Sequence, residues 1–115
     1  MLYRSKAITM ENWDNKTTEE LLEVICALKT KKEAKKFLRD LLTPQEIIEF
    51  SKRWQAARML SESISYSAIE KKTGLSSTTI ARVSRWLSQG TGGYKLMIQR
   101  LSNTHHHNRT LMRRG

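Results

Sequence analysis

The chain has 115 residues, of which 38% are hydrophobic and 28% charged, a size and composition typical of one polar domain. Its formal net charge of +10 favours a polyanionic partner, either nucleic acid or an acidic surface. No apolar run approaches the roughly 18 residues that cross a membrane, and the amino terminus lacks a signal-peptide core. A single cysteine, Cys26, fits a reducing compartment. We therefore expect a cytoplasmic protein without a membrane partner.

Helical periodicity dominates the chain and predicts an all-α fold of six helices. Residues 1–16 are polar and aperiodic, which predicts a flexible segment. Thr17 with Glu20, and Thr30 with Glu33, have the pattern of a capping box. Thr43-Pro44 is typical of a helix start, because proline suits the first helical position. The expected helices cover about 18–29, 31–41, 44–61, 66–73, 77–88 and 93–102, and a basic flexible tail is expected over 103–115.

The stretch 65–87 has the form of a helix-turn-helix DNA reader. Its first helix is expected to end at Thr73-Gly74, where only glycine adopts the left-handed backbone conformation without steric strain. Its second helix is expected to begin just after Ser76. Four apolar side chains are spaced so that the two helices share one small core: Ile69, Leu75, Ile80 and Val83.

Small hydroxyl side chains crowd the start of the second reader helix, where hydroxyls and backbone amides can meet phosphates or base edges. Either Ser76 or Ser77 also serves as an N-cap in any interpretation. Ala81 could touch a thymine methyl group. The basic candidates for phosphate contacts could equally be solvated charges. The predicted DNA-binding residues are Tyr66, Ser67, Lys71, Lys72, Ser76, Ser77, Thr78, Thr79, Ala81 and Arg85.

Six short helices enclose little volume, and the first three predicted helices each have a wide apolar face. These faces favour an intertwined homodimer, which would present two readers about one DNA turn, or roughly 34 Å, apart. A compact monomer is the alternative.

No glycine-rich phosphate loop, metalloprotease pattern or suggestive acid–base pair occurs, so we expect no enzyme. His105, His106 and His107 are adjacent and have no thiolate or carboxylate nearby, so we expect no metal site. Cys26 lies within an apolar helical pattern and is expected to be a buried structural residue.

Together, LLTPQE at 41–46, Arg53, TGLSSTTIARVSRWL at 73–87 and the Gly-Gly-Tyr at 92–94 resemble the Trp repressor superfamily, especially its YerC/YecD group. The resemblance covers about residues 17–102. It implies a Trp-repressor-like, interlocked homodimer that binds operator DNA with its second reader helix in the major groove.

The resemblance also implies ligand contacts at Thr43, Arg53 and Arg82. Val83 and Trp86 stand where tryptophan-binding relatives have small residues, and their bulk is expected to fill that pocket. Tryptophan and other cofactors are therefore not expected. As an alternative, the two arginines pair with carboxylates such as those of Glu49 or Glu70 and have a structural role.

The favoured function is a sequence-specific DNA-binding transcriptional regulator, a repressor, that acts as a homodimer on double-stranded operator DNA. Three alternatives stay open at this point. They are a non-specific architectural nucleic-acid binder, a protein-interaction module, and a repressor gated by an amino-acid corepressor.

Overall fold

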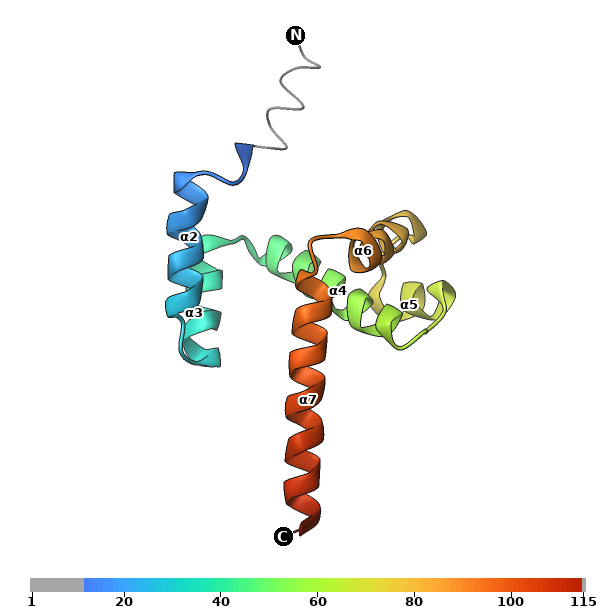
Figure 1. The fold of residues 1–115 in the computed structure, drawn as a ribbon. Helices are drawn as coiled ribbons and strands as arrows, with labels where there is room; N and C mark the ends of the chain where they lie inside the picture. The colour runs from blue at the N-terminus through green and yellow to red at the C-terminus, as the bar shows by residue number, and fades with distance from the viewer. Residues whose placement is uncertain (1–11, 115) are drawn as a thin grey trace. The chain divides into compact units, whose positions relative to one another are not determined.

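The computed structural model describes the backbone of residues 12–114 and the side chains of residues 12–103. The chain divides into two compact units, residues 1–43 and 44–115, and each is described by itself. The described residues form helices and no strand, which confirms the predicted all-α class (Figure 1). The helices are α2 (Lys16–Ala27), α3 (Lys31–Leu41), α4 (Pro44–Ser61), α5 (Tyr66–Thr73), α6 (Ser77–Gln89) and α7 (Gly93–Arg114).

The amino-terminal unit contains α2 and α3, and the sequence predicted only one of their caps correctly. Thr30 caps α3 as expected, accepting a hydrogen bond from the Glu33 amide at 3.1 Å. The cap of α2 is Asn15, whose side chain accepts from the Thr18 amide at 3.1 Å. The prediction of a capping box beginning at Thr17 is therefore wrong. Asparagine is a stronger N-cap than threonine, so α2 begins directly after Asn15, whose position is two residues before the predicted cap.

Neither α2 nor α3 contains a buried residue. The apolar side chains of these helices are instead largely exposed, with Ile25 at 44% and Leu41 at 48%. Cys26 is also exposed, so the expectation of a buried cysteine is wrong for the single chain. The physical reason is that two short helices offer each other too little surface to enclose a core.

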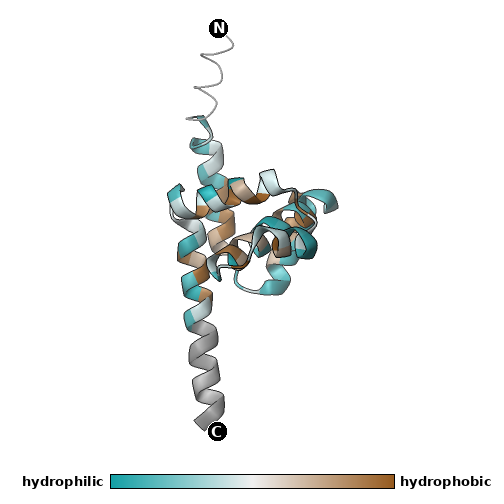
Figure 2. Ribbon diagram, turned by 90° about the vertical axis from the view of Figure 1, so that its right-hand side faces the viewer, coloured by the Kyte–Doolittle hydropathy of each residue, from teal (hydrophilic) through white to brown (hydrophobic). Residues whose placement is uncertain are grey.

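The carboxy-terminal unit has a small core where α4, α5 and α6 meet. Two alanines of α4, Ala56 and Ala57, are fully buried, and their small side chains let the reader helices approach closely. In Figure 2 hydrophobic positions gather along α4 and the helices packed on it. The four apolar residues predicted to share a core are all buried: Ile69, Leu75, Ile80 and Val83.

Helix α7 follows the reader and packs against α4 and α6. The rings of Trp54 on α4 and Tyr94 on α7 stack with centroids 6.3 Å apart. The helix continues to Arg114 and does not end near residue 102 as predicted, because no proline or glycine interrupts it before Gly115. The flexibility predicted for the tail stays a prediction. Within the described part of the chain, no helix is both long and apolar enough to span a membrane.

Candidate nucleic-acid interface

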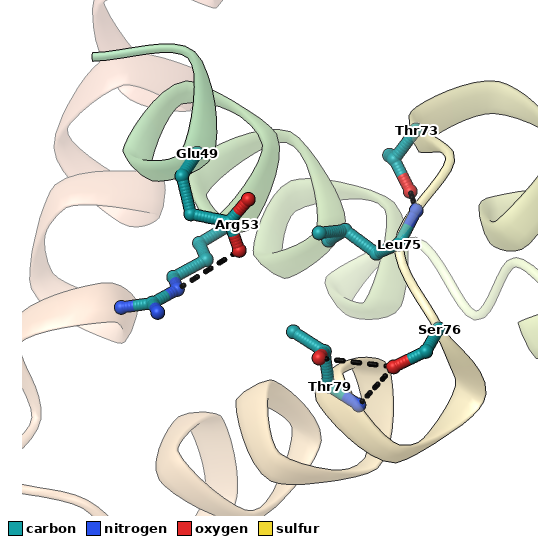
Figure 3. Close-up of polar contacts among 6 residues, drawn as sticks. All are labelled: Glu49, Arg53, Thr73, Leu75, Ser76 and Thr79. Atoms are coloured by element: carbon teal, nitrogen blue, oxygen red, sulfur yellow. Dashed lines mark hydrogen bonds and ion pairs between the residues drawn. The ribbon is translucent and has the colours of Figure 1, made fainter. Parts of the chain in front are cut away.

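The turn between α5 and α6 is fixed by one glycine and one threonine. Gly74 has a φ of 77°, the left-handed conformation predicted for it, and its amide donates to the Glu70 carbonyl at 2.8 Å. The buried Thr73 hydroxyl donates to the Ile69 carbonyl at 2.8 Å. The same hydroxyl accepts from the Leu75 amide at 3.1 Å, a contact drawn in Figure 3. Sequence reasoning did not assign this role to Thr73. The two residues together set the direction in which α6 leaves the turn.

We expect Gly74→Ala to lower the free energy of unfolding by about 1–2 kcal/mol, because an L-residue is strained at positive φ. The cost is purely conformational, since an added Cβ would meet only the Lys52 Nζ at an ordinary 3.8 Å. Gly93→Ala is the matched control, because that position is open and has no positive φ. Denaturant unfolding measures both variants. Equal losses of stability in the two would contradict the assignment.

The first turn of α6 is capped and accessible at the same time. Ser76 is the N-cap, as predicted: its hydroxyl accepts from the Thr79 amide at 3.2 Å and lies 3.0 Å from the Thr79 hydroxyl (Figure 3). Ser76, Ser77 and Thr78 are exposed, and Thr79 is half-buried. Ile80, by contrast, is completely buried. The turn therefore presents hydroxyls and amides on a helix end that the core holds in place.

The other predicted DNA contacts are also accessible. No carboxylate of the described residues forms an ion pair with Lys71, Lys72 or Arg85, so their positive charge is not neutralised within this part of the chain. Tyr66 is 42% exposed at the start of α5. Contact with DNA stays a prediction for the whole set. The exposed members are Tyr66, Ser67, Lys71, Lys72, Ala81 and Arg85.

Lys52 is a candidate phosphate contact that sequence reasoning missed. It lies on α4, and its Nζ is 3.8 Å from the point where a Cβ would stand on Gly74. The ammonium group is therefore next to the turn of the reader. No local signal in the sequence could have identified it, because its position depends on how α4 crosses the turn.

The three predicted ligand contacts are divided between the two units, with Thr43 in the first and Arg53 and Arg82 in the second. Arg53 is paired loosely with Glu49, with Nε and Oε1 3.9 Å apart, which agrees with the structural alternative (Figure 3). Its guanidinium also lies 5.6 Å from the Phe50 ring centre. Arg82 is exposed, and Thr43 ends the other unit. The ligand set therefore stays a prediction.

Val83 and Trp86 have different surroundings, although both were expected to fill a pocket. Val83 is fully buried in the reader core. Trp86 is 43% exposed and borders an apolar cavity of about 590 Å³, and the expectation that it fills a ligand pocket stays a prediction. The cavity lies between α4, α6 and α7. Its lining is Trp54, Trp86, Gly90, Thr91, Gly93, Tyr94 and Met97.

The predicted absence of a metal site concerns His105, His106 and His107, which lie outside the residues whose side chains the structure describes. Among the described side chains, no group of three or more histidines, cysteines or carboxylates could hold a metal ion.

Comparison with known proteins gives matches over most of the chain. The family model of the Trp repressor protein matches residues 16–102. The uncharacterized protein YerC of Bacillus subtilis (strain 168) is 38% identical over 89 residues, which are 77% of this chain and 86% of that protein. A TrpR-like protein from Eubacterium eligens ATCC 27750 superimposes with a TM-score of 0.77 at 38% identity, covering 80% of this chain and 95% of that one. A candidate Trp repressor from Staphylococcus aureus gives 0.76 at 33% identity, covering 81% and 93%.

Proposed function

The chain belongs to the Trp repressor family, and from this premise we propose that it is a sequence-specific DNA-binding transcriptional regulator, a repressor, that acts as a homodimer. The observation that carries the proposal is the first turn of α6. Its hydroxyl side chains are accessible, while the next turn is anchored by the buried Ile80 and Val83. A rigid helix end with small polar side chains fits the major groove, because it can approach base edges closely.

In this proposal the reader uses two kinds of contact. The amides at the start of α6 and the ammonium groups of Lys71 and Lys72 bind phosphates and fix the register on the duplex. Ser77, Thr78 and Ala81 are exposed and face base edges, where hydroxyls and a methyl group discriminate between base pairs. Phosphate contacts supply affinity, and base contacts supply the choice of sequence.

The homodimer is supported by apolar surface that one chain leaves open. Helices α2 and α3 bury nothing, and six of their large apolar side chains are each at least 36% exposed. Full burial of one such side chain contributes about 1.5–3 kcal/mol, so a partner surface that covers several of them is strongly favoured. A second copy offers the same surface. The side chains are Leu21, Leu22, Val24, Ile25, Leu38 and Leu41.

Selection of bound duplexes from a random pool, followed by competition between selected and random duplexes, tests sequence-specific binding. We expect the selected sites to be two-fold symmetric, because two readers in a symmetric dimer contact related half-sites. Selected duplexes should bind at least tenfold more tightly than random ones, or about 1.4 kcal/mol. Equal affinity for both pools would contradict the proposal and favour a non-specific architectural binder.

A second candidate is a repressor gated by a small acidic effector, and one observation favours it. The Nε of Arg53 is buried and has no hydrogen-bond partner in the described part of the chain, so the polar requirement of this arginine is not fully met. An effector carboxylate could reach the exposed end of the guanidinium. Calorimetric titration with amino acids and indole carboxylates tests this function. An absence of heat across the panel would reject gating and leave the DNA-binding proposal intact.

A further inference from the structure

Helix α3 carries five basic side chains that the reader does not use. Four of its first six residues are lysines, and Arg39 follows in the last turn. Successive helical residues are about 100° apart, so the five side chains fall within an arc of about 140°. We call this set the α3 stripe. It consists of Lys31, Lys32, Lys35, Lys36 and Arg39.

The α3 stripe is a continuous basic face. The two acidic residues of the helix, Glu33 and Asp40, fall outside its arc, and the apolar Phe37 and Leu41 lie on the opposite side. The acidic side chains of this unit are gathered elsewhere, since α2 contains three glutamates and a single lysine. Positive charge is therefore concentrated on one helix face.

Neutralisation within the chain does not explain the α3 stripe. All five side chains are exposed, and none forms an ion pair with a described carboxylate. Arg39 donates from Nη1 to the Leu42 carbonyl at 3.3 Å, a contact that caps the helix end and leaves the charge in place. Five like charges on one arc repel one another, and a polyanion that binds along the helix relieves this repulsion.

We propose that the α3 stripe is a second DNA-binding surface, which contacts the phosphate backbone of the same duplex that α6 reads. The inference rests on the proposed function, because it requires that α6 holds the protein on a duplex. The stripe extends about 12 Å along its helix axis, and the same length of duplex carries about seven phosphate charges. Positive charge on one face therefore meets a matching density of negative charge.

The covalent connection favours the same duplex as the partner. Arg39 precedes Pro44 by five residues, so at most about 18 Å of chain separates the stripe from the start of α4. Helix α4 is 18 residues or about 27 Å long and ends close to the reader. A duplex bound by α6 is thus present at high effective concentration near the stripe, whereas any other polyanion must arrive by diffusion.

The test compares two triple variants of the full-length protein that remove the same charge. The stripe variant is Lys32→Gln, Lys35→Gln, Lys36→Gln, and the control is Lys16→Gln, Lys29→Gln, Lys95→Gln, which alters exposed lysines outside the stripe and the reader. Glutamine keeps high helix propensity, so α3 should stay folded, and circular dichroism checks this. The measured quantity is the slope of log affinity against log salt concentration for selected and random duplexes.

The stripe variant should lower the magnitude of the slope by about 2–3 for each chain of the proposed homodimer, because each lost phosphate contact removes about 0.9. Its ratio of affinities for selected and random duplexes should be unchanged, because phosphate contacts carry no sequence information. The control should change the slope by less than about 1. Equal slopes in the stripe variant, the control and the wild type would overturn the inference.

A further arm measures binding to vesicles of phosphatidylglycerol and phosphatidylcholine. Loss of vesicle binding in the stripe variant, together with an unchanged slope for duplexes, would overturn the inference and assign the stripe to an anionic membrane surface. Failure of the proposed function gives a different result, since the wild-type protein would then not distinguish selected from random duplexes. The two failures are therefore separable.

Discussion

Thr79→Asp should lower the affinity for operator duplexes by about 100-fold or more while the protein keeps its fold. The side chain stands in the first turn of α6, so a carboxylate there faces the phosphates of any duplex in contact with that turn. Like charges brought together at an interface cost several kcal/mol, and 100-fold corresponds to about 2.7 kcal/mol. The measurement is fluorescence anisotropy with labelled duplexes at a fixed salt concentration.

Stability separates this effect from unfolding. The Ser76 hydroxyl accepts from the backbone amide of residue 79, so the cap survives the substitution. A carboxylate in the first turn interacts favourably with the helix dipole, and the free energy of unfolding should be equal or about 0.3–1 kcal/mol higher. Thermal melting measures it.

Ser88→Asp is the charge-matched control for Thr79→Asp, because Ser88 is exposed in the last turn of α6, about 14 Å along the helix axis from Thr79. Its affinity for DNA should stay within a few-fold of the wild type. A Thr79→Asp protein that binds DNA as well as Ser88→Asp would show that the first turn of α6 does not face the duplex.

Trp54→Ala should destabilise the protein and weaken the proposed dimer. Trp54 stacks on Tyr94 at 6.3 Å and borders the apolar cavity, so its ring links α4 to α7. Truncation of a large aromatic side chain in a packed site costs about 3–5 kcal/mol. Because Trp54 is only half-buried in the single chain, we expect part of this loss in the melting temperature and part in the association constant. Melting curves and light scattering over a dilution series measure the two parts.

Trp13→Ala is the matched control for Trp54→Ala. Trp13 is 62% exposed and precedes the first turn of α2, so its removal takes away an equal aromatic mass without opening the helical core. This variant should melt and assemble like the wild type. Identical curves for both tryptophan variants would mean that Trp54 supports neither the core nor the association.

Local signals explain why the reader could be predicted from the sequence. Pro44, Gly74 and Ser76 each restrict the backbone through their own chemistry, and the helices begin or end at these residues as expected. The buried positions of α5 and α6 followed from helical periodicity, because Ile69, Ile80 and Val83 lie on the helix faces that the apolar spacing predicted to be buried.

The features that the sequence did not predict depend on contacts between distant residues, or on a choice between neighbouring residues that can take the same structural role. Ser63, not a glycine, adopts a φ of 61° after α4, which no sequence preference indicates. The cap of α2 is Asn15 and not the predicted Thr17, since several neighbouring residue types can cap a helix and the capping-box pattern alone did not identify the right one. The place of Lys52 beside Gly74 requires knowledge of a helix crossing. The roles of the predicted DNA-binding residues stayed predictions for a similar reason. Which exposed side chains contact DNA depends on the bound duplex and not on the local sequence.

The uneven distribution of burial implies that a newly synthesised chain matures in two steps. Residues of α4, α5 and α6 enclose their own core, so this half can become ordered as soon as it leaves the ribosome. Helices α2 and α3 emerge earlier and contain no buried residue of their own, so in the proposed homodimer they would be covered only when a second copy binds. The expression level would then decide how many chains complete the second step. In a cell that makes little of the protein, the core of α4, α5 and α6 would be folded while the apolar faces of α2 and α3 stayed uncovered.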